Sequence, residues 1–212
     1  PLMQNVVADL AIEAEAALAL TLRIARAIDD SATDNSAAAL ARVGLAVGKY
    51  WICKRAPGHA FEAMECHGGL GYVEESMMPR IYREAPVNSI WEGSGNVICL
   101  DVLRAMFQEE ACIPALLTEL DLASGANSAL DATIDELKDE LSNREDLEQR
   151  ARRLTELMAT ALQAALLLQH APAAVADAFC ASRLRPRWSG AYGTLPSGVD
   201  FKAIIDRIST IA

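Results

Sequence analysis

Residues 3–31, MQNVVADLAIEAEAALALTLRIARAIDDS, contain no glycine or proline and carry apolar side chains at helical spacing. These apolar positions are Val6, Leu10, Ala14, Ala17, Leu18, Leu22, Ala25 and Ile28. Side chains that recur three or four positions apart lie on one face of an α-helix. At a rise of about 1.5 Å per residue, the stretch predicts a single helix of roughly 40 Å.

The composition extends this helical expectation to the whole chain. Of the 212 residues, 52% are apolar but only 5% are aromatic, and alanine and leucine supply most of the apolar count. Alanine and leucine rank near the top of helix propensity, whereas β-branched and aromatic residues favour strands. A chain of this length buries about 70% of its unfolded surface, which is enough for a core without disulfides or metals. No apolar run reaches about 18 residues, so we expect no membrane-spanning helix.

Turn and breaker residues divide the rest of the chain into further helices. Residues 33–36, Thr-Asp-Asn-Ser, predict an N-cap, and Pro57 with Gly58 is expected to end the helix that follows at about residue 55. In that helix, Gly44 and Gly48 would permit close contact with a neighbour. Further helical segments are expected at about residues 59–67, 80–83, 97–106, 131–148, 148–170, 172–184 and 201–208. Antiparallel helices joined by short loops predict an all-α helical bundle.

The net charge of −10, from 19 basic and 29 acidic residues, bears on the choice of partners. Nonspecific nucleic-acid binding neutralises phosphates with lysine and arginine, so this charge disfavours it. Arg183, Arg185 and Arg187 with Trp188 form a local pattern that favours such binding, through phosphate contacts and base stacking. Arginines that follow the end of a helix are more often solvated and complement the helix dipole.

The five cysteines are scattered, with no CxxC pair and no metal-ligand spacing to the three histidines. An odd, scattered set predicts free thiols in a reducing compartment, so we expect a cytoplasmic location and no metal site. The first residues lack the basic and apolar regions of a signal peptide. They enter a helical pattern almost at once, which suggests a piece of a longer protein.

Residues 65–104 have the least ordinary composition and hold three motifs. These are Gly68-Gly69-Leu70-Gly71-Tyr72, Arg83-Glu84 and Ile90-Trp91-Glu92-Gly93-Ser94. Glycine-rich loops let backbone N–H groups approach a phosphate or ribose, and a carboxylate in such a loop is a candidate general base. Each motif also has a plain structural explanation, because glycines often end helices and acidic residues often stabilise helix starts.

Taken together and in this order, the motifs resemble the C-terminal helical domain of the acyl-CoA dehydrogenase superfamily. The sequence of residues 84–104 is similar to that of the AidB-type branch of this superfamily, the adaptive-response flavoproteins related to isovaleryl-CoA dehydrogenase. The resemblance covers about residues 1–108, which would form the family bundle. Residues 109–212 would be an added helical region packed on it, matched by position and helicity.

The resemblance implies dehydrogenation of acyl-CoA thioesters with FAD. Glu92 occupies the position of the base that removes the α-proton while the flavin accepts the β-hydride, and its backbone N–H helps hold the thioester carbonyl. The implied substrate-contact positions are Trp91, Gly93 and Arg104. The implied FAD-contact positions are Glu65, where many relatives have glutamine, and Gly68, Gly69, Ser94 and Asn96, of which Gly68 and Gly69 correspond to a loop that contacts the FAD of a neighbouring subunit. An equally weighted explanation of Arg104 is an ion pair with Asp101 on the same helix.

Family members are larger than this chain, assemble as homotetramers, and hold the flavin partly on a β-domain. Since no β-rich segment is present, the isolated chain is expected neither to retain FAD nor to turn over acyl-CoA. A second interpretation is a DNA- or partner-binding module of the DNA-alkylation response with little dehydrogenase turnover. A third is a helical oligomerisation domain.

Overall fold

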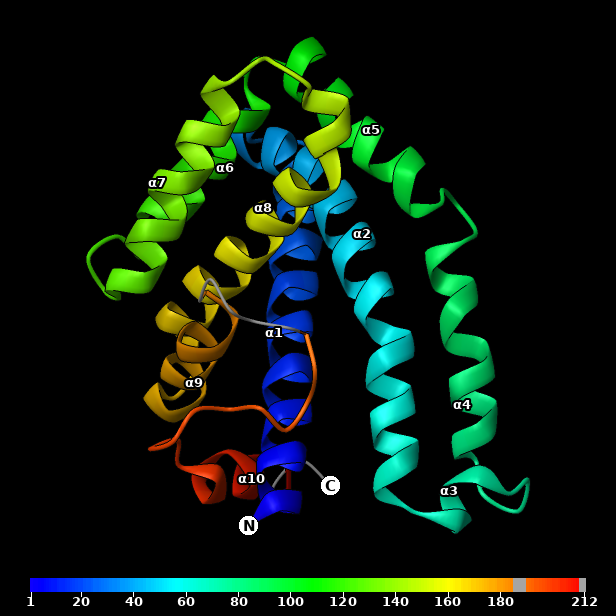
Figure 1. Ribbon diagram of the computed structural model, residues 1–212. Helices are drawn as coiled ribbons and strands as arrows, with labels where there is room; N and C mark the ends of the chain where they lie inside the picture. Colours follow the sequence, from blue (N-terminus) through cyan, green and yellow to red (C-terminus); the bar gives the residue numbers. More distant parts are fainter. Residues whose placement is uncertain (185–189, 210–212) are drawn as a thin grey trace.

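All regular structure in the computed structural model is helical over residues 1–184 and 190–209, the residues that the structure describes (Figure 1). Its elements are α1 (Leu2–Asp30), α2 (Asn35–Cys66), α3 (Gly69–Tyr72), α4 (Met78–Glu84), the 3-10 helix η1 (Ala85–Ser89), α5 (Gly95–Gln108), α6 (Cys112–Asp121), α7 (Ser128–Ser142), α8 (Leu147–His170), α9 (Ala173–Arg183) and α10 (Phe201–Ser209). The predicted all-α fold class is confirmed. None of the described helices combines the length and the apolar character needed to cross a bilayer.

Helices α1 and α2 form a long packed pair. Asp34 caps α2 as predicted, because its carboxylate accepts hydrogen bonds from the backbone N–H groups of Ser36 and Ala37 at 2.7 and 3.2 Å. Where the two helices touch, a Cβ atom added to Gly48 would lie 2.7 Å from Cδ1 of Ile24. The predicted close contact at this glycine is confirmed, since a side chain there would crowd the facing helix.

Helix α2 continues through Pro57 to Cys66, so the predicted break at Pro57-Gly58 is wrong. Proline removes one helical hydrogen bond and crowds the preceding turn, which usually kinks or ends a helix. Here packing on both sides offsets that cost, because Trp51 before the proline and Ala60 after it are buried. The separate helix expected at residues 59–67 is the last part of α2.

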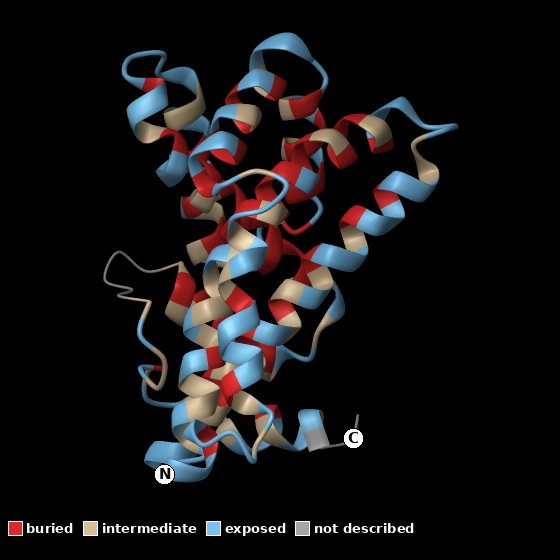
Figure 2. Ribbon diagram, turned by 90° about the vertical axis from the view of Figure 1, so that its right-hand side faces the viewer, coloured by how far each residue is buried: buried red, intermediate tan, exposed pale blue. Residues whose placement is uncertain are grey.

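Helix α8 lies at the centre of the second half of the chain and contacts α1, α2, α5, α6, α7 and α9. Leu154, Met158 and Leu162 recur along it at helical spacing and are buried. Within this core, the indole Nε1 of Trp51 on α2 donates a hydrogen bond to Oε1 of Gln163 on α8 at 3.0 Å. One continuous apolar core therefore joins α1, α2 and α5 to helices α6–α9 (Figure 2).

The charged stretch expected as one helix over residues 131–148 consists of two elements. Helix α7 ends at Ser142 and α8 begins at Leu147. Between them, Asp146 adopts a left-handed backbone with φ 48°, and Leu147 turns into the core. Residues 143–146, Asn-Arg-Glu-Asp, hold no glycine or proline, but Asn143 and Asp146 are turn-forming residue types, and Oδ1 of Asn143 accepts a hydrogen bond from the N–H of Glu145.

After α2 the chain turns at Gly68 and returns beside α2 through α4 and η1 (Figure 1). We call residues 68–94 the arm. It carries several exposed large apolar side chains, namely Leu70, Tyr72, Val73, Met77, Ile81, Tyr82, Val87, Ile90 and Trp91. The glycine-rich turn lies at one end of the arm and the loop that carries Glu92 lies at the other, directly before α5.

Candidate functional site

The loop between η1 and α5 holds Glu92 in an unusual backbone conformation. Glu92 has φ 53° and Gly93 has φ 112°. A side chain other than glycine reaches the left-handed region at a cost of about 1–3 kcal/mol, and such residues persist only where the surroundings hold them. At Gly93 an added Cβ would lie 2.6 Å from Cδ1 of Ile98. The turn therefore needs glycine at position 93 and tolerates strain at position 92.

Lys49 on α2 forms hydrogen bonds with the backbone of this loop. Its Nζ donates hydrogen bonds to the backbone carbonyl oxygens of Asn88, Trp91 and Gly93 at 2.7, 3.0 and 3.2 Å. An ammonium group has three N–H donors, so all three are used on one loop. The sequence reasoning missed Lys49. Its signal was present, because Lys49 is the charged residue within the otherwise uncharged stretch 43–51.

The side chains predicted around Glu92 lie on an open surface. Glu92, Trp91 and Ser94 are exposed, with Trp91 at 60%. Ser94 is the N-cap residue of α5, but its hydroxyl makes no capping hydrogen bond. Glu92, Trp91, Gly93 and Ser94 are thus brought together at the start of α5, accessible to a ligand that would cover them.

Asn96 lies beside this group, but its side chain forms a hydrogen bond with a residue of another helix. Its Oδ1 accepts a hydrogen bond from Nε of Arg152 on α8 at 2.9 Å. The contact ties the start of α5 to the region expected as an addition to the family bundle.

Arg104 is separated from Glu92 by most of α5. Arg104 lies nine positions after Gly95, which corresponds to about 14 Å along the helix. Nη1 of Arg104 donates to Oδ1 of Asp101 at 3.1 Å, and Asp101 also accepts two hydrogen bonds from Arg42. The ion-pair explanation of Arg104 is confirmed. The structure does not bring Arg104 to the Glu92 loop.

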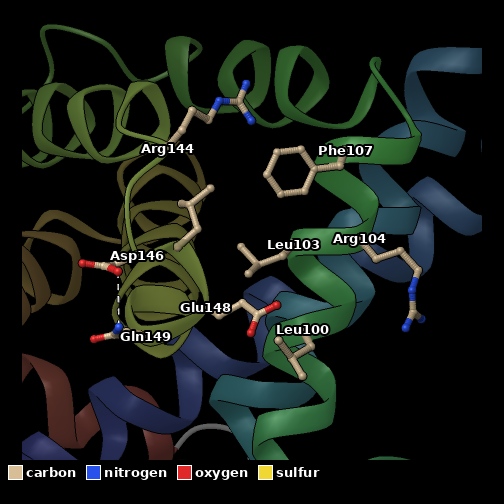
Figure 3. Close-up of a pocket in the computed structure, with 9 residues that line it drawn as sticks. Leu100, Leu103, Arg104, Phe107, Arg144, Asp146, Glu148 and Gln149 are labelled. Carbon is tan, nitrogen blue, oxygen red and sulfur yellow. Dashed lines mark hydrogen bonds between the residues drawn. The ribbon is translucent and has the colours of Figure 1, made fainter.

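A cavity of about 720 Å³ lies between α5 and the start of α8, at the far end of α5 from Glu92. Leu100, Leu103 and Phe107 form its apolar wall, and Glu148 reaches toward that wall from α8 (Figure 3). The guanidinium of Arg144 lies 5.1 Å from the ring centre of Phe107. Arg104 contributes to the rim, with its guanidinium directed away from the cavity (Figure 3).

The glycine-rich turn at the other end of the arm combines a helix stop with an open backbone. Gly68 has φ 58°, and its N–H donates to the carbonyl oxygen of Glu65, as expected where α2 ends. A Cβ added to Gly68 or Gly69 meets nothing within 4 Å, whereas one at Gly71 would lie 2.0 Å from the carbonyl oxygen of Met64. Gly71 is therefore required sterically. Glu65, Gly68 and Gly69 are exposed, and they are separated from Glu92 by the length of α4 and η1 (Figure 1).

Arg183 is not a solvated helix-end charge, so both interpretations given to it from the sequence are wrong. Its side chain is 2% exposed and forms ion pairs with Asp9 and Glu13 of α1. Arg55 of α2 joins the same cluster through Glu13. A guanidinium held between two buried carboxylates has no free face for a phosphate. Arg185, Arg187 and Trp188 lie outside the described residues.

The described residues include five free cysteines and no candidate metal cluster. Cys99, Cys112 and Cys180 are buried, Cys53 and Cys66 are half-buried, and all five are free. Burial raises the pKa of Cys180 to about 12. Within residues 1–184 and 190–209, no three His, Cys, Asp or Glu side chains are grouped closely enough to hold a metal ion.

Comparison with known proteins gives the family of this chain. Residues 1–107 match the sequence profile described as acyl-CoA dehydrogenase, C-terminal domain. The chain belongs to the acyl-CoA dehydrogenase family. The resemblance inferred from residues 65–104 is confirmed.

Individual relatives agree with this assignment. The chain is 40% identical over 188 residues to the putative acyl-CoA dehydrogenase AidB of Escherichia coli, a match that covers 88% of this chain and 34% of that protein. It is 30% identical over 142 residues to acyl-CoA dehydrogenase family member 11 of Caenorhabditis elegans, covering 66% of this chain and 23% of the relative. The chain thus spans about a third or less of the length of these acyl-CoA dehydrogenase relatives.

A solved structure shares the fold of this acyl-CoA dehydrogenase domain. Caenorhabditis elegans ACDH-11 in complex with C11-CoA superposes with a TM-score of 0.73 at 23% identity, covering 94% of this chain and 37% of that one. Because the match extends over nearly the whole chain, it includes helices on both sides of residue 108.

Proposed function

We propose that this chain is the C-terminal part of an FAD-dependent acyl-CoA dehydrogenase and supplies the base Glu92 for α,β-dehydrogenation of acyl-CoA thioesters. The single observation that carries the proposal is the loop at residues 90–94. Its glutamate stands in a strained, solvent-facing turn at the start of α5, and the chain belongs to a family whose motif it matches at this position.

In this proposal the Glu92 carboxylate takes the α-proton of the thioester. The electron pair left at the α-carbon forms the double bond to the β-carbon, from which a hydride departs. The developing charge on the thioester oxygen is stabilised by the backbone N–H of Glu92. Trp91 and Gly93 flank the reacting carbons and exclude water. Accepting the hydride is the chemistry that a bound FAD supplies.

The residues of this chain fit part of an FAD site. At Gly68 and Gly69 the backbone is open, since an added Cβ meets nothing within 4 Å. The hydroxyl of Ser94 makes no capping hydrogen bond to α5, so it is available to a ligand. In the proposal Ser94 and Asn96 contact FAD near Glu92. At the other end of the arm, Gly68 and Gly69 contact the FAD of a neighbouring subunit, and Glu65 lies toward the flavin diphosphate region. The chain alone then supplies only part of the FAD site. For this reason we expect that the isolated chain neither retains FAD nor turns over substrate.

The test is flavin bleaching in the complete, FAD-loaded protein that carries this chain, mixed with acyl-CoA thioesters of several chain lengths. Glu92→Gln removes the base while keeping size and polarity. We expect bleaching by the best substrate to slow by about 10²–10⁴-fold, the usual contribution of a positioned base. Glu75→Gln, at an exposed acid of the same arm outside the matched motifs, serves as the control. Unchanged bleaching in Glu92→Gln would remove the glutamate from this role.

The second candidate is an AidB-type binding module with little dehydrogenase turnover. It is supported by the match to AidB, which at 188 residues extends well past the 107 residues of the family profile. The charge of −10 and the burial of Arg183 weigh against binding of DNA by this chain. Salt-dependent duplex binding by the complete protein, lost on replacing Arg185 and Arg187, would favour this candidate.

Assembly, location and domain organisation complete the proposal. We infer a homotetramer in the cytoplasm, with residues 1–108 as the family bundle and residues 109–212 as an added helical region. Exposed apolar side chains on α1 and along the arm, such as Leu18, Leu22 and Trp91, support burial in an assembly. Analytical ultracentrifugation of the complete protein tests the tetramer.

A further inference from the structure

We propose that Lys49 is a positioning residue that turns the backbone N–H of Glu92 toward the substrate. The catalytic part of this inference rests on the proposed function. The structural part, that the ammonium of Lys49 fixes the loop at residues 88–93, stands on the contacts alone.

The contacts of Lys49 fall on both sides of Glu92. Nζ lies 3.0 Å from the carbonyl oxygen of Trp91, which precedes the glutamate, and 3.2 Å from that of Gly93, which follows it. The third bond, to the carbonyl oxygen of Asn88 at 2.7 Å, anchors the loop to the end of η1. Hydrogen bonds from a charged donor are stronger than those between neutral groups.

The bond to Trp91 decides where the N–H of Glu92 points. The carbonyl of Trp91 and the N–H of Glu92 belong to one peptide group, in which they point in opposite directions because the bond is trans. Since Lys49 draws the carbonyl toward α2, the N–H is directed away from α2. No described residue accepts a hydrogen bond from this N–H. It is thus oriented as a donor on the open side of the loop.

The left-handed conformation of Glu92 explains why a clamp is needed. At φ 53° the residue lies outside the backbone regions that glutamate prefers, and a free loop would relax from it. Lys49 stabilises the strained form by bonding carbonyls on both sides of it. Gly93 makes the same turn sterically permissible, because a Cβ there would strike Ile98.

The first experiment measures amide hydrogen exchange in the 212-residue chain, with no flavin present. The reporters are the amides of Ile90 and Trp91, which donate to the carbonyl oxygen of Val87 within the loop. In Lys49→Met we expect both amides to exchange at least about tenfold faster, with partial recovery in Lys49→Arg. Lys138→Met, a replacement of an exposed lysine on α7, should leave them unchanged. Far-UV circular dichroism verifies folding, and Lys49→Gln replaces Lys49→Met if the latter fails to fold.

The second experiment measures flavin bleaching in the complete, FAD-loaded protein. Loss of one oriented oxyanion donor lowers kcat by about 10²–10³-fold and affects the transition state more than the ground state. We therefore expect Lys49→Met to lower kcat by that factor with less than about a threefold change in acyl-CoA affinity, and Lys49→Arg to restore part of the rate. A general structural defect would lower kcat and acyl-CoA affinity by similar factors, and Lys49→Arg would not restore the rate.

The two failures are distinguishable. Exchange at Ile90 and Trp91 within twofold of the unmodified chain in a folded Lys49→Met variant overturns the clamp, whatever the activity. Faster exchange with an unchanged kcat overturns the positioning of the N–H. If Glu92→Gln leaves bleaching intact, the proposed function fails, and the exchange result alone then decides the clamp.

Discussion

The guanidinium of Arg183 on α9 lies 2.5 Å from the carboxylate of Asp9 on α1, with both side chains no more than 2% exposed. Glu13, one turn further along α1, lies 3.1 Å from the same guanidinium and also accepts two hydrogen bonds from Arg55. Two acids and two bases therefore close a buried cluster between α1, α2 and α9. Its balance of charge is what makes it tolerable in the core.

Replacing Arg183 with methionine should destabilise the chain strongly. Methionine keeps much of the volume but leaves Asp9 and Glu13 buried with one guanidinium between them. Breaking one side of a buried ion pair costs about 3–5 kcal/mol. Urea denaturation followed by far-UV circular dichroism measures the loss. Arg26→Met, which removes an exposed pair with Asp30, is the control and should change the free energy of unfolding by less than about 1 kcal/mol. A similar small change for Arg183→Met would show that the cluster contributes little.

The cluster should also make stability fall in acid. Burial alone would raise the pKa of Glu13, but Arg55 and Arg183 together hold it below its ordinary value of 4.5. The unfolded chain then binds a proton at a higher pH than the folded one. The stabilisation is present above pH 4.5 and is lost as the pH falls through the lower pKa of the folded state. Glu13→Gln should be less stable at neutral pH and show a shallower decline below pH 4.5. If the free energy of unfolding declined with pH in the same way in Glu13→Gln and in the unmodified chain, this prediction would be contradicted.

Replacement by alanine should destabilise the protein at one glycine of the glycine-rich turn and have little effect at another. At Gly71 a Cβ would lie 2.0 Å from the carbonyl oxygen of Met64, so the backbone must move. At Gly69 the added methyl meets open space at the first position of α3. We expect Gly71→Ala to lower the free energy of unfolding by about 2 kcal/mol or more, and Gly69→Ala to leave it within about 0.5 kcal/mol. Thermal denaturation of the pair, measured side by side, tests the difference, and equal effects would refute the steric account.

Residues 1–108 and 109–212 should unfold together. The core is continuous between them, and Trp51 is hydrogen-bonded to Gln163 across the proposed boundary. In a variant with Trp91 and Trp188 changed to phenylalanine, the fluorescence of Trp51 reports this contact. Its urea transition should coincide with that of circular dichroism, as in a two-state protein. Two separated transitions would instead indicate independently stable units.

Periodicity was sufficient to predict helices such as α1, α8 and α9 with ends close to those observed. It failed at Pro57, where tertiary packing outweighed the local cost of proline, and at residues 143–146, where Asn143 and Asp146 form the turn without glycine or proline. The family motif identified Glu92 with Gly93 and Ser94, since those residues are adjacent in the chain. Lys49, Arg152 and the partners of Arg183 escaped prediction because each contact joins residues that are distant in sequence.

The reciprocal hydrogen bonds between Asn5 and Leu195, 190 residues apart, have a consequence for the order of folding. Gly193 likewise donates to Asp9 at 2.9 Å. A ribosome adding roughly 5–20 residues per second takes on the order of ten seconds or more to deliver these partners. Until then Asp9 and Glu13 of α1 lack Arg183, and the side-chain amide of Asn5 lacks its backbone partner at Leu195. The N-terminal end of α1 is therefore packed only after residues 183–195 have been synthesised, and a chain that stops before them leaves Asp9 without its contacts to Arg183 and Gly193.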